Sequence, residues 1–376
     1  MYCSGLASIL PSVHSYYEVG GIPVCDELVR ALKLVASTIA DEVRRAEEVA
    51  RGIRELEAYE LKLEVGSSPP SIVASDSSRV FRNLSVAIVF AIQAVAIRSS
   101  ASGYPALRTR GEAGSYIISF EERKSPADEI VDRVSRFVAR DMEVSTAAEL
   151  LDGVDLALFD GSLSSFLWYG KLPEVPRELK LTLSWRPSTL RDLWRSIARG
   201  LLGVRGRVLP VFIAKSVRKS YYVERVLPGI KQSEEGEALN DLVLLNYMRT
   251  RGLLPRVPHI VEPMYLEKVE DLPKPLKNLD PEDRGYVEPL LPVTVTYVAF
   301  GSTTQYYQVS IPGRLSPEEV VEVLSSLHPY SRSGYPDPLR VAHSRCRITS
   351  REFRLILAKL GLTHIPTGRE PLGEFL

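Results

Sequence analysis

The stretch Asp155–Leu163, DLALFDGSL, is the part of the sequence from which the fold can be argued. Its four apolar residues, 156–159, form a run typical of a buried strand, and the run ends at Asp160, followed at once by glycine and serine. A carboxylate is therefore predicted at the end of a core strand, where a rigid backbone can fix a metal ligand. An ordinary strand followed by an Asp-Gly turn gives the same pattern, so this stretch alone leaves both interpretations open.

A second stretch of the same design lies upstream at Ser71–Arg79, SIVASDSSR, where a short apolar strand is predicted to end at Asp76. Between the two aspartates, the β-branched segment 80–99 and the segment 115–120 predict further strands. Apolar residues at three-and-four spacing then predict a helix over 127–151. The predicted order is a strand with an aspartate, two strands, a helix, and a second strand with an aspartate.

This order is that of the ribonuclease H-like fold, an α/β fold with a mixed sheet and flanking helices. In that fold a meander of three antiparallel strands is followed by a helical crossover, which returns the chain parallel to the first strand. Asp76 and Asp160 would then emerge side by side. Because neighbouring carboxylates repel each other unless a cation lies between them, the pair indicates a magnesium or manganese site, and the chemistry of such sites is phosphodiester hydrolysis.

Composition places the chain among globular proteins: it has 376 residues, is 45% hydrophobic and carries no net charge. Its three cysteines are scattered and form no CxxC pair, which predicts reduced thiols and no structural zinc. The longest apolar run falls short of the roughly 20 residues that a membrane span needs. Because the N-terminus also lacks the basic region of a signal peptide, we expect a cytoplasmic protein without membrane contact.

We predict three regions along the chain. Residues 1–66 form an N-terminal helical segment, whose long helix contacts a second subunit or partner, or lies on its own domain. Residues 67–361 form the ribonuclease H-like domain. Within it, 260–292 is rich in proline and acid without clear periodicity, and is predicted as an insertion or lid. Residues 362–376 are a tail.

Local signals predict the remaining elements. They are a strand over 207–214 that ends at Lys215, a hairpin over 293–300 and 305–311, a helix capped by Ser188, a helix opened by the capping box 316–319, a loop over 333–345, and a closing helix over 350–360.

Basic residues are concentrated in two parts of the chain. Between Arg195 and Arg225 eight basic residues stand against one acidic residue, and basic residues predominate again between Arg332 and Arg354. Together with interleaved tyrosines they suit a nucleic-acid track, because cations bind phosphates and aromatic rings stack on bases. A basic surface without function, and a solvated lysine at 215, fit the same pattern. The candidate nucleic-acid-binding residues are Lys215, Arg218, Lys219, Tyr221, Arg340 and Arg345.

Three motifs, Ser75–Ser78, Phe159–Leu163 and the late Tyr335-Pro336 followed by His343, resemble the NurA family of archaeal DNA-end resection nucleases. The resemblance implies a metal site formed by a strand aspartate, a helix glutamate, a second strand aspartate, a tyrosine and a histidine. The matching residues here are Asp76, Glu143, Asp160, Tyr335 and His343. One departure is Asp-Ser-Ser at residues 76–78, where the family pattern is Asp-Gly-Ser, so the turn expected after the aspartate would differ.

Without the resemblance, other roles fit these residues. On a helical wheel Glu143 lies off the apolar stripe, which also suits a solvated residue. Similarly, His343 suits a core histidine and Tyr335 a turn tyrosine. With the resemblance, Asp76, Glu143, Asp160 and His343 are implied ligands of Mn²⁺ or Mg²⁺; His343 would complete the metal shell or transfer a proton, and Tyr335 would hold the phosphate or stack on a base.

The resemblance further implies a metal-dependent deoxyribonuclease. It would act as a 5′ to 3′ exonuclease and single-strand endonuclease on DNA ends, in resection for recombinational repair, as a homodimer that encloses DNA and works with a HerA-type hexameric translocase. Two other classes are considered. An ATPase related to actin or sugar kinases is disfavoured because residues 77–83 contain no glycine. A non-catalytic DNA clamp or adaptor for a DNA motor fits the basic tracks equally well.

Overall fold

The structure is a computed structural model of the 376-residue chain. It describes residues 30–37, 40, 44, 56–62, 69–84, 86–100, 103–117, 127–167, 175, 179–182, 187, 189–215, 221–226, 240–272, 276, 279–301 and 305–362. Its contacts divide the chain into two compact units. One unit comprises Met1–Arg54 and Lys219–Met248, and the other comprises Glu55–Arg218 and Arg249–Leu376. The predicted boundaries near residues 66 and 361 stay predictions.

The first unit contains α5 (Tyr221–Val226) and most of α6 (Asp241–Thr250). Residues 30–37 are helical, as predicted, whereas most of the expected N-terminal helix lies outside the described residues. The helical prediction is wrong for Ala58–Glu60, which lie in the second unit and form strand β1, paired with His259–Val261. Sequence periodicity could not reveal this three-residue strand, since its partner lies about 200 residues away.

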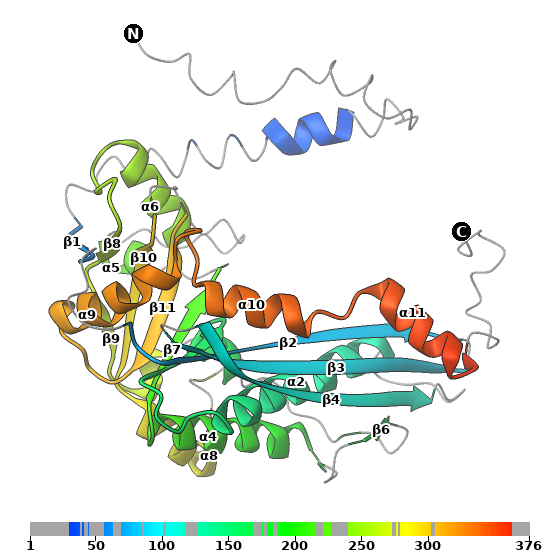
Figure 1. Ribbon diagram of the computed structural model, residues 1–376. Helices are drawn as coiled ribbons and strands as arrows, with labels where there is room; N and C mark the ends of the chain where they lie inside the picture. Colours follow the sequence, from blue (N-terminus) through cyan, green and yellow to red (C-terminus); the bar gives the residue numbers. More distant parts are fainter. Residues whose placement is uncertain are drawn as a thin grey trace. The chain divides into compact units, whose positions relative to one another are not determined.

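The second unit contains the predicted meander and crossover (Figure 1). Strands β2 (Ile72–Asn83), β3 (Ala87–Ser100) and β4 (Gly103–Ile117) pair antiparallel in chain order. Helix α2 (Ala127–Ala148) follows, and β5 (Leu156–Asp160) then lies parallel to β2. The ribonuclease H-like α/β prediction is therefore confirmed.

The sheet continues beyond this core on both sides. It contains 11 strands among the described residues, in the order β1-β8-β10-β11-β7-β5-β2-β3-β4-β6, with β9 paired to β10. The bounds of the added strands are β6 Leu179–Leu181, β7 Leu209–Ala214, β8 His259–Val261, β9 Met264–Leu266, β10 Val293–Ala299 and β11 Tyr307–Pro312. Strand β7 runs parallel to β5, so the carboxyl ends of these two strands lie at the same edge.

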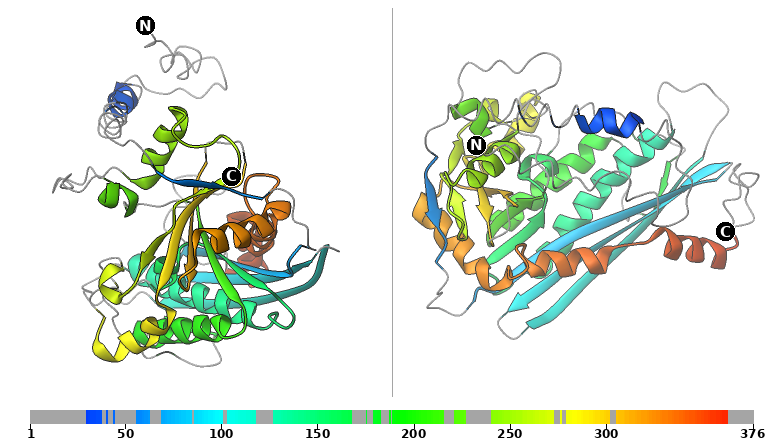
Figure 2. Two further views of the ribbon diagram at one scale, coloured as in Figure 1. Left: turned by 90° about the vertical axis from the view of Figure 1, so that its left-hand side faces the viewer. Right: turned by 90° about the horizontal axis from the view of Figure 1, so that it is seen from above.

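Helices cover both faces of the sheet (Figure 1 and the left view of Figure 2). Helices α2 and α4 (Leu190–Arg205) pack on one face, and α9 (Pro317–Leu327) and α10 (Asp337–Cys346) on the other. In α2 the buried residues recur at helical spacing, and in α10 Leu339, Ala342 and Cys346 are buried against the strands. Because each buried aliphatic side chain contributes about 1.5–3 kcal/mol, these two faces fix the position of α2 and α10 on the sheet.

Of the two predicted helix caps, one is confirmed and one is wrong, and three further helices complete the unit. The helices are α3 (Leu163–Phe166), α8 (Pro281–Val287) and α11 (Ser350–Lys359), with single 3₁₀ turns at Val269–Asp271, Glu288–Leu290 and His328–Tyr330. The capping box at Ser316 and Glu319 is present. The predicted cap of α4 is wrong by one residue: Thr189, not Ser188, forms a capping box with Asp192, whose carboxylate accepts the Thr189 N–H at 2.8 Å.

Two segments predicted as irregular have regular structure. The loop predicted over 333–345 contains α10, whose signal is weak because prolines 336 and 338 open a helix of only ten residues. The segment 260–292 contains β9, α8 and part of β8, so the prediction that it lacks regular structure is wrong, whereas its assignment as an insertion or lid stays a prediction. Its three-residue strands are too short to give periodicity. No described helix combines the length and apolar character needed to cross a membrane.

Candidate active site

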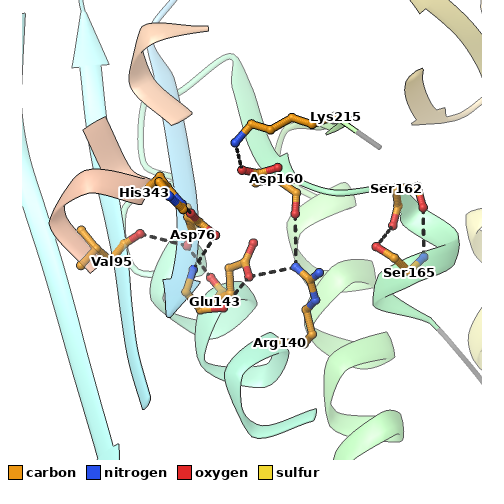
Figure 3. Close-up of polar contacts among 11 residues, drawn as sticks. Asp76, Val95, Arg140, Glu143, Asp160, Ser162, Ser165, Lys215 and His343 are labelled. Carbon is orange, nitrogen blue, oxygen red and sulfur yellow. Dashed lines mark hydrogen bonds and ion pairs between the residues drawn. The ribbon is translucent and has the colours of Figure 1, made fainter. Parts of the chain in front are cut away.

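Four of the predicted site residues meet at one edge of the parallel strands (Figure 3). Asp160 is the last residue of β5, Glu143 lies in α2, and His343 comes from α10 on the opposite face of the sheet. The prediction that Asp76 ends its strand is wrong, because β2 continues to Asn83. Asp76 instead follows the last β2 residue that pairs with β5, so its carboxylate still lies beside the end of β5, and no turn follows it.

Asp76 is held by two hydrogen bonds. Its Oδ2 lies 2.7 Å from Nδ1 of His343, and its Oδ1 accepts the backbone N–H of Ser77 at 2.7 Å. The Asp76 side chain is only 9% exposed, whereas that of His343 is 55% exposed. Burial, reinforced by the charge of Asp160, raises the pKa of Asp76 above its ordinary value, although His343 and Ser77 act in the opposite direction. The arrangement orients the His343 ring and leaves it open to solvent.

Glu143 is fully buried, so the solvated alternative is wrong. Its Oε2 accepts hydrogen bonds from Ser77 Oγ at 3.0 Å and Arg140 Nη1 at 3.2 Å, while its Oε1 is buried without a hydrogen-bond partner. Burial raises the pKa of Glu143 to about 8; Arg140 opposes this shift and Asp76 adds to it. The helical wheel failed here because the buried alanines 139 and 147 let this face of α2 approach the sheet.

Asp160 is paired with Lys215, which follows the end of β7. Lys215 Nζ donates to Asp160 Oδ2 at 2.6 Å and lies 4.5 Å from the centre of the Tyr335 ring. The Tyr335 hydroxyl is buried without a hydrogen-bond partner. Its burial, with the nearby charges of Asp160 and Asp76, raises its pKa above the usual range. Tyr335 is therefore a neutral phenol beside the acidic cluster, and Lys215 is not a free solvated lysine.

Two residues of the site were missed at the sequence level. Arg140 lies one turn before Glu143 in α2 and also donates to the Asp160 carbonyl at 3.2 Å, with its guanidinium 4.1 Å over the ring of Phe166. Cys346 lies one turn after His343 in α10 and is buried. Spacing of three residues from a predicted ligand is the signal that could have identified both.

The predicted nucleic-acid-binding residues are distributed unevenly. Arg340 and Arg345 are exposed on α10, the helix that carries His343. Tyr221 belongs to the first unit, and Arg218 and Lys219 lie outside the described residues.

Part of the basic stretch has a structural role. Arg195 contacts the buried carboxylate of Asp283 at 2.8 Å, and Arg207 contacts Asp152 at 2.5 Å. The charge surplus counted between Arg195 and Arg225 therefore overstates the cations available to a ligand.

The residues of this cluster fit a divalent cation. Three carboxylates and an imidazole are the donors that Mn²⁺ or Mg²⁺ sites use. The unpartnered Oε1 of Glu143 is the strongest sign, because a buried carboxylate oxygen without a donor or cation is unfavourable. The fold and this cluster define a ribonuclease H-like domain with an acidic site at the ends of its parallel strands.

Comparison with known proteins gives the family. The NurA domain family matches residues 70–348, so the chain belongs to the NurA family of nucleases. The crystal structure of the NurA nuclease from Sulfolobus solfataricus is similar over 94% of this chain and 100% of that chain, with a TM-score of 0.59 and 17% identity. A crystal structure of NurA bound to dAMP and manganese is similar over 88% of this chain and 96% of that chain, with a TM-score of 0.52 and 14% identity.

One curated relative matches over a short stretch. The uncharacterized protein MJECL07 of Methanocaldococcus jannaschii is 37% identical over 59 residues, which are 16% of this chain and 14% of that protein. The match therefore spans a small part of the relative's length. At their low identities, the likenesses to solved structures show the fold.

Proposed function

We propose that the chain is a metal-dependent DNA nuclease whose residues Asp76, Glu143, Asp160 and His343 hold Mn²⁺ or Mg²⁺. The observation that carries this proposal is that these four side chains come together at the ends of the parallel strands, and that one of them, Glu143, has a buried carboxylate oxygen without a hydrogen-bond partner. A NurA structure determined with manganese, and another with dAMP and manganese, support the choice of metal and of a nucleotide substrate.

The chemistry divides between the metal and the protein. When bound, the divalent ions activate water and stabilise the charge that develops on the phosphate. Asp76 orients the His343 ring through Nδ1, so that the exposed part of the imidazole faces solvent and can transfer a proton. Arg140 holds Glu143 and the end of β5 in a fixed relation. Tyr335 holds a phosphate oxygen through its unpartnered hydroxyl or stacks on a base.

The finer description also belongs to the proposal. The nuclease acts on single- and double-stranded DNA ends as a 5′ to 3′ exonuclease and single-strand endonuclease, in end resection for recombinational repair. It acts as a homodimer together with a HerA-type hexameric ATPase. Membership of the NurA family and the sequence motifs support this description. The alternative is a non-catalytic clamp or adaptor for a DNA motor, whose function would not require an acidic cluster that can bind a cation.

Digestion of DNA tests the proposal directly. Purified protein is incubated with single- and double-stranded DNA labelled at the 5′ or 3′ end, in Mn²⁺, Mg²⁺ or EDTA. We expect degradation with Mn²⁺ and none with EDTA, because the carboxylates require the metal. The order in which the two labels are released gives the polarity. DNA that is bound but uncut in either metal, with and without the ATPase, would favour the clamp.

Lys215 is expected to contribute to DNA binding. Its ammonium has three N–H donors, of which Asp160 uses one, and its side chain is 43% exposed, so a phosphate oxygen can be a second partner. Lys215→Met should weaken DNA binding uniformly across sequences and reduce the salt slope, log K against log [salt], by about 1. Fluorescence anisotropy at several salt concentrations measures both. Lys268→Met, at an exposed lysine that precedes the 3₁₀ turn Val269–Asp271, is the matched control; equal effects of the two variants would argue against a phosphate contact at Lys215.

A further inference from the structure

The proposed nuclease chemistry leaves one member of the cluster unused, the thiol of Cys346. This residue is fully buried, and its Sγ donates to the His343 carbonyl at 3.3 Å. Ligand atoms of Asp76, His343 and Cys346 all lie within 4.8 Å of one another. Within the described part of the chain, no other trio of histidine, cysteine or acidic side chains lies so close together.

The thiol of Cys346 distinguishes this trio from the ligands proposed above for Mn²⁺ or Mg²⁺. A carboxylate oxygen, an imidazole nitrogen and a thiolate sulfur are all ligands of Zn²⁺, with bonds of about 2.0–2.3 Å, whereas Mg²⁺ and Mn²⁺ prefer oxygen. Zinc commonly takes three protein ligands and leaves a fourth position open. In a tetrahedral zinc site such bonds place two ligand atoms about 3.5 Å apart, so ligand atoms within 4.8 Å of one another need side-chain movements of about 1 Å to close around one ion.

The neighbouring carboxylate is an independent sign that this pocket receives a cation. Glu143 is fully buried and its Oε1 has no hydrogen-bond partner. Burial, together with the charges of Asp76 and Glu143, raises the pKa of the Cys346 thiol. The thiol is therefore surrounded by donor atoms and negative charge, and it is not an isolated core cysteine.

We propose that Asp76, His343 and Cys346 form a thiolate-containing Zn²⁺ site that overlaps the proposed site of the catalytic metal. On binding, the Cys346 sulfur forms a bond to zinc and its proton leaves to solvent. Asp76 and His343 exchange their mutual hydrogen bond for bonds to the same ion. Because Asp76 and His343 serve both ions, Zn²⁺ and Mn²⁺ exclude each other, and zinc inhibits DNA cleavage. The inhibition rests on the proposed function, whereas the zinc site does not.

Cobalt spectroscopy of the full-length protein tests the site without DNA. Co²⁺ is added in place of Zn²⁺, and the near-ultraviolet charge-transfer band of a cobalt–thiolate bond is recorded. We expect the band in the wild type and in the controls Cys3→Ser and Cys25→Ser, and its absence in Cys346→Ser. Zinc affinity, measured against a chromophoric chelator, should fall at least about 100-fold in Cys346→Ser, since loss of an outer partner of a metal ligand alone costs 10–100-fold. Affinity for Mn²⁺ should be unchanged.

A band that persists in Cys346→Ser, or equal zinc affinity of the two proteins, would overturn the zinc site. If circular dichroism shows that Cys346→Ser does not fold, His343→Gln replaces it, because the exposed His343 side chain can be changed without a cavity; unchanged zinc affinity in that variant overturns the proposal as well. If the wild type shows the band but does not cleave DNA, the zinc site is supported and the nuclease proposal is contradicted. If it cleaves DNA but shows no band, the nuclease proposal is supported and the zinc site is contradicted.

Discussion

Replacing Asp160 by asparagine is expected to abolish DNA cleavage while leaving the fold and DNA binding close to those of the wild type. The amide has the same size and can still accept a hydrogen bond from Lys215, but it lacks the negative charge that a divalent ion requires. Removal of one electrostatic contributor from an active site costs about 10²–10³ in rate, and we expect a loss of at least this size. The backbone contacts of the strand end, Gly161 N–H to the Ile213 carbonyl and Arg140 to the Asp160 carbonyl, do not involve the carboxylate.

The experiment compares three proteins in Mn²⁺: wild type, Asp160→Asn and Asp132→Asn. Asp132 is a partly exposed residue of α2 that pairs with Arg79 and Arg136 outside the cluster, so its variant controls for the loss of a carboxylate as such. Cleavage rates, DNA affinity by anisotropy and thermal melts are measured for each. Undiminished cleavage by Asp160→Asn would remove Asp160 from the site. An unfolded variant would make its role structural, and a loss in Asp132→Asn as well would point to a general effect of charge.

The fold could be predicted from the sequence because its central elements are local patterns. Apolar runs gave β5 and β7, and the three-and-four spacing of α2 gave the crossover that sets β5 parallel to β2. Asp76 was wrongly predicted to end its strand because the serines and arginines after it interrupt the alternation of apolar and polar residues in the second half of β2. That half is a strand because it pairs with β3, from Ser77 opposite Ala94 to Asn83 opposite Ile88, and no local pattern contains this information.

The site could be predicted only in part. The two aspartates followed from strand signals, whereas Glu143, Tyr335 and His343 depended on the family resemblance. Arg140 and Cys346 were missed because their roles arise from contacts between elements: Arg140 meets the end of β5, and Cys346 lies against Asp76, about 270 residues earlier in the chain. The burial of Glu143 on the polar side of α2 could likewise not be predicted from the sequence of the helix, because the surface that covers it is a strand of the sheet.

Replacing Glu143 by glutamine is expected to stabilise the metal-free protein at pH 8 while removing much of its metal binding. Burial raises the pKa of Glu143 to about 8, against an ordinary value of 4.5. The folded state therefore holds a proton that the unfolded chain releases. The stabilising contribution of this proton is fully present below pH 4.5, and it is lost progressively as the pH rises to about 8, with a slope of up to about 1.4 kcal/mol per pH unit.

The glutamine variant lacks this loss because an amide does not ionise. Its oxygen can take the place of Oε2 and accept from Ser77 and Arg140, and its NH₂ group takes the place of the unpartnered Oε1. In EDTA, the difference in free energy of unfolding between variant and wild type should therefore be small at pH 5 and grow in favour of the variant by several kcal/mol towards pH 8. Denaturant titrations at the two pH values measure it. Glu149→Gln, at an exposed glutamate paired with Arg110, should shift stability by less than about 1 kcal/mol at both.

Addition of Mn²⁺ at pH 8 should make the wild type more stable than the Glu143→Gln variant. A ligand that binds only the folded state stabilises it by about 2.7 kcal/mol at 100 times its Kd. The wild type gains this contribution, because a cation compensates the buried Glu143 carboxylate and removes the penalty of ionisation. The variant has no carboxylate charge at residue 143 to bind the cation, so Mn²⁺ should stabilise it less. If Mn²⁺ stabilised both proteins equally, Glu143 would not be a ligand; if the variant were the less stable protein in EDTA at pH 8, the buried carboxylate would be satisfied by the protein itself, and the case for a cation at this site would lose its main support.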